Sequence, residues 1–335
     1  MVDLLPRLRD LGNEVELLLF DGTRTAFYEE LEQKGIKIHH LGVGGNVYNP
    51  LNILKLTEFV NRYDIIHTHN TACQLFVPIA KMLKGSKAKL VTTEHSANNR
   101  RRDKWYLKPV DKWMYNRYKL IICISEKPAE NLRKHIGAKE SIIVVNNGVD
   151  VARFLCPIKD VSQNKSFLVS QVSSFNDAKD QDTLVKAMKE LPDNYRLQLA
   201  GDGIRRPIVE ELSNTLGIKD RVDFLGIRTD IPEILKSSDI VVLSSHWEGL
   251  SLSSIEGMAS GRPFIASDVD GLREVVEGAG ILFPHSDYKQ LAKEIRQLCT
   301  NPIHYNVVAQ DCQKRAQQFD INTMIEKYNE LYESL

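Results

Sequence analysis

The densest group of chemically competent side chains lies at residues 244–263, directly after a short apolar run. Here Glu248 and Glu256 are separated by seven residues, and the hydroxyl-rich stretch between them has the pattern of a helix start. Free N–H groups at such a start attract an anion, and Gly249 lets the backbone come close to a ligand. The segment therefore predicts a diphosphate site, with two carboxylates better suited to binding hydroxyls than to paired acid–base catalysis.

Two further groups of polar residues follow apolar runs in the first half of the chain. Residues 64–70 and 92–96 each end a predicted strand with histidine and hydroxyl side chains. Open α/β sheets bind ligands at the carboxyl ends of their strands. We therefore predict that His69, Asn70 and His95 line a ligand site, although histidines at strand ends also serve purely structural roles.

The elements that position these residues alternate between short β-rich runs and longer helical patterns. This alternation is typical of parallel sheets with crossover helices, so we predict an α/β protein with two doubly wound parallel sheets. The strands predicted in the first half are 15–20, 36–41, 64–67, 88–93, 120–124 and 142–145. Those predicted in the second half are 166–172, 195–200, 222–225, 240–243, 263–266 and 280–283.

The length of 335 residues exceeds the usual size of one domain, and the pattern weakens after residue 148. We predict an N-terminal domain at 1–153, a second domain at 154–318 and a C-terminal amphipathic helix within 319–335. The chain opens with a helical pattern at 2–11, whereas a doubly wound domain is expected to open with a strand. We therefore expect the first strand to be missing; the alternative is a domain that begins with a helix.

Composition and charge exclude several classes of protein. Hydrophobic residues make up 42% and charged residues 26%, which is typical of a globular protein, and no apolar run approaches the roughly 20 residues that span a bilayer. The net charge of zero argues against nucleic-acid binding, but it hides a surplus of +6 in residues 1–150 and an equal deficit beyond them. The five cysteines are scattered without metal-ligand spacing, which indicates a reducing, cytoplasmic setting.

With its surroundings, the glutamate pair resembles the EX7E signature of glycosyltransferase family 4, whose members are retaining enzymes of the GT-B fold. The resemblance rests on the segment EGLSLSSIEGMASGRPFIASDVDGL at 248–272 and extends to 147–150, 173–184, 201–203 and 222–228. It implies two facing domains, a terminal helix that crosses back to the first, and transfer of a sugar from a nucleotide diphosphate sugar with its anomeric configuration kept. UDP is the favoured nucleotide because it is common in the family.

The same resemblance implies roles for individual residues. The implied catalytic residues are His95, Lys179 and Glu248. The implied donor-binding residues are Glu256, Gly249, Leu250, Ser251, Gly203 and Arg228, and those on the acceptor side are His69 and Asn70. In this scheme Lys179 neutralises the leaving diphosphate, a task that a fixed cation and aimed N–H donors perform without a metal ion.

One departure from the family pattern concerns the phosphate site. Ser173 and Ser174 stand where the family has a Gly-Arg pair, so the usual phosphate-binding arginine is absent. Arg205 and Arg206 are candidate replacements, the alternative being a solvated pair at a helix start. The sequence Asp-Val-Asp at 268–270 has the letters of a metal motif but belongs to the loop after the next strand, so we predict neither a metal site nor a cofactor.

A basic and aromatic stretch lies between Arg100 and Lys119, with eight basic and two acidic residues. This mixture suits the headgroup region of an anionic membrane, and no nucleic-acid recognition motif accompanies it. The alternative is a solvated helix whose aromatic side chains pack inward. We predict a cytoplasmic enzyme, peripheral on the inner face of a membrane, that acts on a polysaccharide, lipopolysaccharide or lipid-linked acceptor.

Two other functions stay open at this point. One is a nucleotide-sugar epimerase of the same fold, which is expected to lack this EX7E-type arrangement. The other is a chain that binds a nucleotide sugar without turnover, a function that the serine pair and the expected loss of the first strand both leave open.

Overall fold

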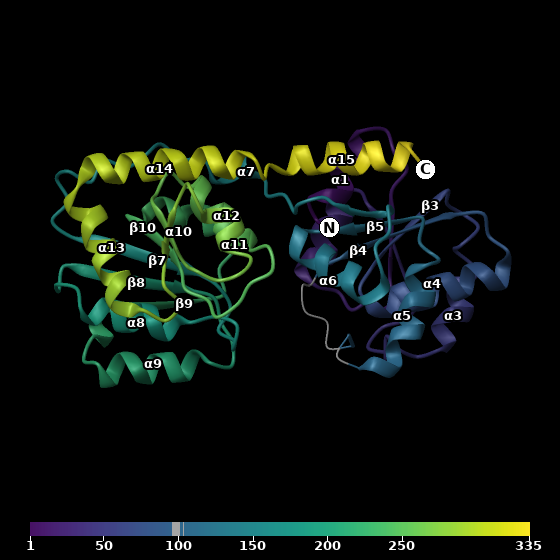
Figure 1. The fold of residues 1–335 in the computed structure, drawn as a ribbon, viewed down its shortest axis with the longest axis horizontal. Helices are drawn as coiled ribbons and strands as arrows, with labels where there is room; N and C mark the ends of the chain where they lie inside the picture. The colour runs from purple at the N-terminus through teal and green to yellow at the C-terminus, as the bar shows by residue number, and fades with distance from the viewer. Residues whose placement is uncertain (96–100, 103) are drawn as a thin grey trace. The chain divides into compact units, whose positions relative to one another are not determined.

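The computed structural model of the protein describes residues 1–95, 101–102 and 104–335. The chain divides into two compact units (Figure 1). Unit 1 comprises Met1–Asn147 together with Ile321–Leu335, and unit 2 comprises Gly148–Asp320. Every strand predicted from the sequence is present, and all strands named below pair in parallel. Of the helices in the described ranges, none combines the length and the apolar character needed to cross a bilayer.

Unit 1 contains two parallel sheets within its described residues. β1 (Glu16–Leu19) pairs with β2 (Lys37–His40). A four-stranded sheet has the order β3 (Ile65–His69), β4 (Lys89–Glu94), β5 (Leu120–Cys123) and β6 (Ile142–Val144). In this sheet His69 stands in register with Thr93, so the polar residues that follow β3 and β4 leave the sheet at the same edge.

The helices of unit 1 pack against its two sheets, with α2 (Ala26–Gln33) beside β1 and β2 and other helices on both faces of the four-stranded sheet. They are α1 (Leu4–Asp10), α2, α3 (Leu51–Leu56), α4 (Thr71–Lys84), η1 (Trp105–Leu107), α5 (Lys108–Tyr115), α6 (Glu126–Ile136) and α15 (Ile321–Glu333). Successive strand residues point to opposite faces. Ile121 accordingly packs in a cluster with Phe76 of α4, whereas its neighbour Ile122 packs with Leu8 of α1 and Ile325 of α15. Burial on both faces explains why these strands are apolar throughout.

Unit 2 is built on one six-stranded sheet. Its strands are β7 (Phe167–Val172), β8 (Tyr195–Ala200), β9 (Val222–Gly226), β10 (Ile240–Leu243), β11 (Phe264–Ser267) and β12 (Ile281–Phe283), in the order β12-β11-β10-β7-β8-β9. Its helices are α7 (Val151–Phe154), α8 (Gln181–Lys189), α9 (Arg206–Thr215), η2 (Lys219–Arg221), α10 (Ile231–Ser237), α11 (Leu252–Ala259), α12 (Arg273–Val276), α13 (Tyr288–Thr300) and α14 (Pro302–Gln317). The central strands β7 and β10 are adjacent although about 70 residues separate them in the chain.

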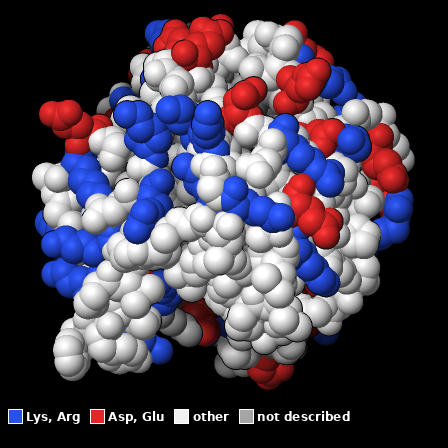
Figure 2. Space-filling model, turned by 90° about the vertical axis from the view of Figure 1, so that its right-hand side faces the viewer, with Lys and Arg blue, Asp and Glu red and all other residues white. Residues whose placement is uncertain are grey.

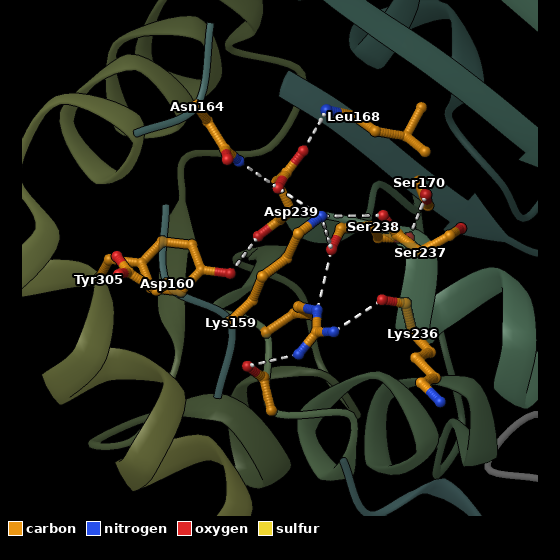
Figure 3. Close-up of polar contacts among 12 residues, drawn as sticks. Lys159, Asp160, Asn164, Leu168, Ser170, Lys236, Ser237, Ser238, Asp239 and Tyr305 are labelled. Atoms are coloured by element: carbon orange, nitrogen blue, oxygen red, sulfur yellow. Dashed lines mark hydrogen bonds and ion pairs between the residues drawn. The ribbon is translucent and has the colours of Figure 1, made fainter. Parts of the chain in front are cut away.

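A buried polar network fixes the beginning of β10 against β7 (Figure 3). The carboxylate of Asp239 accepts hydrogen bonds from Asn164 Nδ2 at 2.9 Å and from the backbone N–H of Leu168 at 2.7 Å, and it pairs with Lys159 Nζ at 2.7 Å. The carbonyl of Asp239 accepts a bond from the buried Tyr305 hydroxyl at 2.8 Å. The carboxylate of Asp239 thus joins the start of β10 to β7 and to the segment 159–164 that precedes β7.

Replacing Asp239 by Ala should lower the free energy of unfolding by about 3 kcal/mol, because it leaves buried donors and a cation without their partner. Urea unfolding followed by fluorescence measures the loss. The matched control is Asp223→Ala, which breaks only the exposed pair with Arg196 and should cost about 0.5 kcal/mol. Equal losses in the two variants would contradict the role given to Asp239.

Candidate active site

Most predicted functional residues of the second half lie after β7 and β10, where the strand order of unit 2 reverses, whereas Gly203 follows β8 and Arg228 follows β9. From β7 the chain continues to β8 and β9 on one side, whereas β10, β11 and β12 lie on the other side. The loops after β7 and β10 therefore leave the sheet side by side, and such a switch point is where open α/β sheets bind ligands. An antiparallel bridge between Lys179 and Ser245 joins the two loops.

Lys179 and Glu248 form an ion pair at this edge. The ammonium of Lys179 contacts Oε1 of Glu248, and the hydroxyl of Ser245 donates to the same oxygen at 2.8 Å. Each side chain of the pair is only 12% exposed, so the two charges interact more strongly than they would in open water. The structure brings these two predicted catalytic residues together, and their catalytic roles stay a prediction.

The predicted phosphate-binding stretch runs from this pair into α11. Ser251 occupies the N-cap position of α11, yet its side chain accepts no bond from any described N–H of that helix. A Cβ placed on Gly249 would meet no described heavy atom within 4 Å, so open space adjoins the backbone there. Leu250 is buried, and Glu256 lies partly buried in the second turn of α11. The positive end of α11 is thus available to an anion.

Two glycines near this edge are required by close backbone contacts. Gly203 has φ +152°, and a Cβ there would lie 2.3 Å from the carbonyl oxygen of Phe175. Gly271 has φ +83°, and a Cβ there would lie 1.9 Å from the carbonyl oxygen of Gly249. Gly203 is a predicted donor-binding residue, whereas Gly271 has no predicted role, because a close approach between distant loops leaves no local signal in the sequence.

The arginines considered from the sequence are all engaged with carboxylates. Arg228 is exposed and donates to Asp230 at 2.8 Å. Arg205 donates to Asp182 at 2.9 Å and lies 3.7 Å from Asp177, so its guanidinium is held against the loop that carries Lys179. The further candidate, Arg206, pairs with Glu210 at 2.7 Å. Of these three arginines, only Arg205 pairs with carboxylates of the Lys179 loop and the start of α8.

In unit 1, three histidines cluster at the carboxyl edge of β3 and β4. His69 Nδ1 lies 2.9 Å from His95 Nε2, and the rings of His67 and His69 stack with centroids 4.4 Å apart. His67 contacts the hydroxyls of Tyr332 at 2.6 Å and Thr93 at 2.8 Å. Burial, together with the nearby His95, lowers the pKa of His67 to about 3, and desolvation also lowers the pKa of His69 and His95. The cluster is therefore uncharged at neutral pH and offers hydrogen bonds.

Asn70 adopts a strained backbone directly after β3. Its φ of +73° is unusual for a residue other than glycine, and its side chain caps no described N–H of α4. Such strained residues concentrate at functional sites, which agrees with the prediction that Asn70 lines a ligand site. Ser96 and Arg100, which belong to two of the predicted motifs, lie outside the described residues.

The described part of the basic stretch is divided between core and surface. Arg101 pairs with the buried Asp111, and Arg102 lies 3.2 Å from the buried carboxylate of Glu94. These two cations neutralise interior carboxylates and are therefore not available as a surface charge. The aromatic residues divide in the same way, with Tyr115 and Tyr118 buried and Trp105 and Tyr106 exposed.

Comparisons with known proteins identify the family of the chain. The family described as Glycosyltransferase Family 4 matches residues 1–153, and the family described as Glycosyl transferases group 1 matches residues 157–319. The chain belongs to the family 4 type of glycosyltransferases. The predicted membership of glycosyltransferase family 4 is thereby confirmed, as is the prediction that the chain is a transferase, whereas the retaining mechanism stays a prediction.

Two relatives illustrate the range of the family. The chain is 28% identical to the putative glycosyltransferase EpsD of Bacillus subtilis, over 85% of this chain and 81% of EpsD. It is 26% identical to the UDP-Gal:alpha-D-GlcNAc-diphosphoundecaprenol alpha-1,3-galactosyltransferase of Escherichia coli, over 81% of this chain and 75% of that enzyme.

A solved structure confirms the fold. HepE from Anabaena, whose structure was solved in complex with UDP, superposes on this chain with a TM-score of 0.86 and 25% sequence identity. The match covers 100% of this chain and 95% of HepE. The fold is GT-B, as predicted from the family resemblance.

The histidine cluster predicts how stability depends on pH. A histidine whose pKa is lowered in the folded state binds fewer protons than in the unfolded state, so stability falls as the pH drops below about 6.5. His67 alone should account for roughly 2 kcal/mol of the loss between pH 7 and pH 5. Urea unfolding of His67→Asn should therefore show a shallower dependence on pH. Identical slopes in wild type and variant would contradict a partly buried, neutral His67.

Proposed function

We propose that this glycosyltransferase moves a sugar from a nucleotide diphosphate sugar with retention of configuration and without a metal ion. The observation that carries the proposal is the Lys179–Glu248 pair beside the uncapped start of α11, at the switch point of the sheet. As the bond to the diphosphate breaks, negative charge grows on the leaving oxygen. A fixed cation and aimed N–H groups stabilise that charge.

The environment of Glu248 favours front-side displacement over a covalent intermediate. Its Oε1 is occupied by the ammonium of Lys179 and by the hydroxyl of Ser245. Hydrogen bonds from a cation and a hydroxyl draw negative charge from the carboxylate, which makes Glu248 a poorer nucleophile. In the proposed mechanism Glu248 contacts the donor sugar and keeps Lys179 aimed at the phosphates.

UDP is the proposed nucleotide of the donor. HepE was crystallised with UDP and also with UDP and glucose. On this chain the proposed donor-binding residues follow the family resemblance. Glu256 is proposed to bind the ribose hydroxyls, and the backbone N–H groups of Gly249, Leu250 and Ser251 the phosphates. Gly203 and Arg228 are proposed as further donor-binding residues. Arg205, held beside Lys179, is the proposed substitute for the missing family arginine.

Unit 1 is the proposed acceptor-binding part. The neutral imidazoles of His69 and His95, with the strained Asn70, offer hydrogen bonds suited to sugar hydroxyls. The family resemblance implies a catalytic role for His95. A glycan or lipid-linked acceptor, such as that of a polysaccharide or lipopolysaccharide pathway, is supported by the lipid-linked substrate in the name of the Escherichia coli relative.

An exposed part of unit 1 supports peripheral binding to an anionic membrane. Trp105, Tyr106 and Val110 are exposed on η1 and α5, and the neighbouring Lys104 and Lys108 are exposed as well. Figure 2 shows lysine and arginine side chains gathered next to an uncharged area on one face of the molecule. Aromatic side chains among cations favour the headgroup region of anionic lipid.

Replacing Lys179 by Ala should slow transfer at least about 100-fold while the fold is kept, because the leaving diphosphate loses its cation. Release of UDP from a UDP-sugar in the presence of acceptor measures this rate. Lys189→Ala is the matched control, since Lys189 is an exposed lysine at the end of α8, and it should retain wild-type turnover. Unchanged turnover in Lys179→Ala would overturn the mechanism.

Radiolabelled nucleotide sugars separate the proposed transfer from the two other functions. A transferase releases nucleotide and moves the label to the acceptor. An epimerase converts the sugar while it stays on the nucleotide, and a binder raises the melting temperature of the protein with no change in the donor. Either of the last two results would contradict the proposed function.

Membrane binding should depend on the exposed aromatic pair. The wild-type protein should sediment with vesicles that contain an anionic phospholipid and be released by salt, and Trp105→Ala/Tyr106→Ala should weaken binding at least about tenfold. Ile303→Ala, at an exposed apolar residue of α14 in unit 2, is the control and should bind as wild type. Salt-insensitive binding, or equal binding by both variants, would refute a membrane surface on η1 and α5.

A further inference from the structure

A second polar cluster lies on the reverse side of the bridge that joins the loops after β7 and β10. The two loops run antiparallel there, since Asp180 N–H donates to the Ser244 carbonyl at 3.1 Å and His246 N–H donates to the Ala178 carbonyl at 2.8 Å. Successive residues in such a pairing point to opposite faces. One face carries the side chain of Lys179, and the other therefore carries the side chains of Asp180 and His246.

The reverse face brings two histidines and one aspartate together. His246 Nε2 lies 3.8 Å from Asp180 Oδ1, and His246 Nδ1 lies 2.8 Å from Nε2 of His285, which enters from the loop after β12. One potential ligand atom of each residue lies within 4.8 Å of the other two. Three segments that are far apart in the chain thus present two nitrogens and one oxygen to the same point.

The aspartate of this cluster is held in place by its own partners. Asp180 is 3% exposed and caps α8, accepting the Thr183 N–H at 3.2 Å on Oδ1 and the Thr183 hydroxyl at 2.7 Å on Oδ2. The hydroxyl of Ser286 donates to Oδ2 at 3.2 Å. Ser286 has φ +62° and directly follows His285, so the same contact anchors the turn that presents the histidine. Hydrogen-bonded ligands of this kind are typical of metal sites.

We propose that Asp180, His246 and His285 bind one divalent transition-metal ion of the zinc type. Two imidazole nitrogens and a carboxylate oxygen are ligands that zinc accepts, with a fourth position left for water. Bonds of about 2.0–2.2 Å in a tetrahedron place ligand atoms roughly 3.4 Å apart. One ligand atom from each of the three residues lies within 4.8 Å of the other two, so side-chain rotations can bring them to this spacing. His285 is exposed, which gives the ion an entry path.

The bound ion would act as a clamp behind the donor site. It would tie the start of α8, the loop after β10 and the loop after β12 together, directly behind Lys179. The ion takes no part in the reaction, since Lys179 and Glu248 meet on the other face of the bridge. Sequence spacing does not reveal the site, because its ligands come from three loops that only the sheet order brings together.

Calorimetric titration of the reduced protein with ZnSO₄ tests the proposal without reference to glycosyl transfer. Wild type should bind one Zn²⁺ per chain, and His246→Ala and His285→Ala should each lower the affinity at least about tenfold, because each removes a ligand. Asp180→Asn should also weaken binding while it retains the helix cap, since asparagine caps helices as well as aspartate does. His304→Ala, at a histidine of α14 outside the cluster, should bind as wild type.

Cobalt provides an independent readout of the same site. Co²⁺ bound by wild type should give the intense visible absorption of tetrahedral cobalt, and this absorption should be absent from His285→Ala. Circular dichroism of each variant without metal shows that it has folded. Zinc binding that is absent from wild type, or that is equal in wild type, His246→Ala and His285→Ala, would overturn the proposal and leave a hydrogen-bonded histidine pair. Neither result depends on whether the chain transfers sugar.

Discussion

The adjacency of β7 and β10 is the constraint on which the site in unit 2 depends. Because these strands are neighbours in the sheet, the loops that follow them pair through Lys179 and Ser245. That pairing orients Lys179 toward Glu248 on one face and sets Asp180 beside His246 on the other. Both the proposed reaction and the proposed metal site therefore depend on the connection that returns the chain from β9 to β10, beside β7.

The packing of β10 beside β7 is stabilised by the burial of apolar side chains and by a small polar network. Side chains of β7, β10 and β11 such as Val169, Val241 and Ile265 are almost wholly buried, and each buried aliphatic side chain contributes roughly 1.5–3 kcal/mol. Apolar burial alone specifies no strand order, since it is not directional. Asp239 adds a directional contact, because its Oδ2 accepts the backbone N–H of Leu168 in β7 at 2.7 Å. Arg262 extends this network through its bond to the Ser238 carbonyl at 2.8 Å.

The fold could be predicted from the sequence because its signals are local. Strands that are buried on both faces, such as β5 and β10, have continuous apolar runs, and glycine or polar residues end them. The Lys179–Glu248 pair could be predicted only through the family resemblance, since 69 positions separate its members. Gly271 and the Asp180–His246–His285 cluster were missed because their contacts depend on sheet order. The basic stretch between Arg100 and Lys119 offers fewer surface cations than its sequence indicates, because Arg101 and Arg102 pair with the buried carboxylates of Asp111 and Glu94.

In the proposed reaction, the Lys179–Glu248 pair at the switch point cleaves a nucleotide sugar with retention of configuration. The most direct test follows the first sugar product by NMR, with water as a surrogate acceptor. The donor is the UDP-sugar that most raises the melting temperature of the protein. The first anomer released should have the configuration of the donor, and Lys179→Ala should release it more slowly than wild type. Release of the inverted anomer would contradict the proposed mechanism.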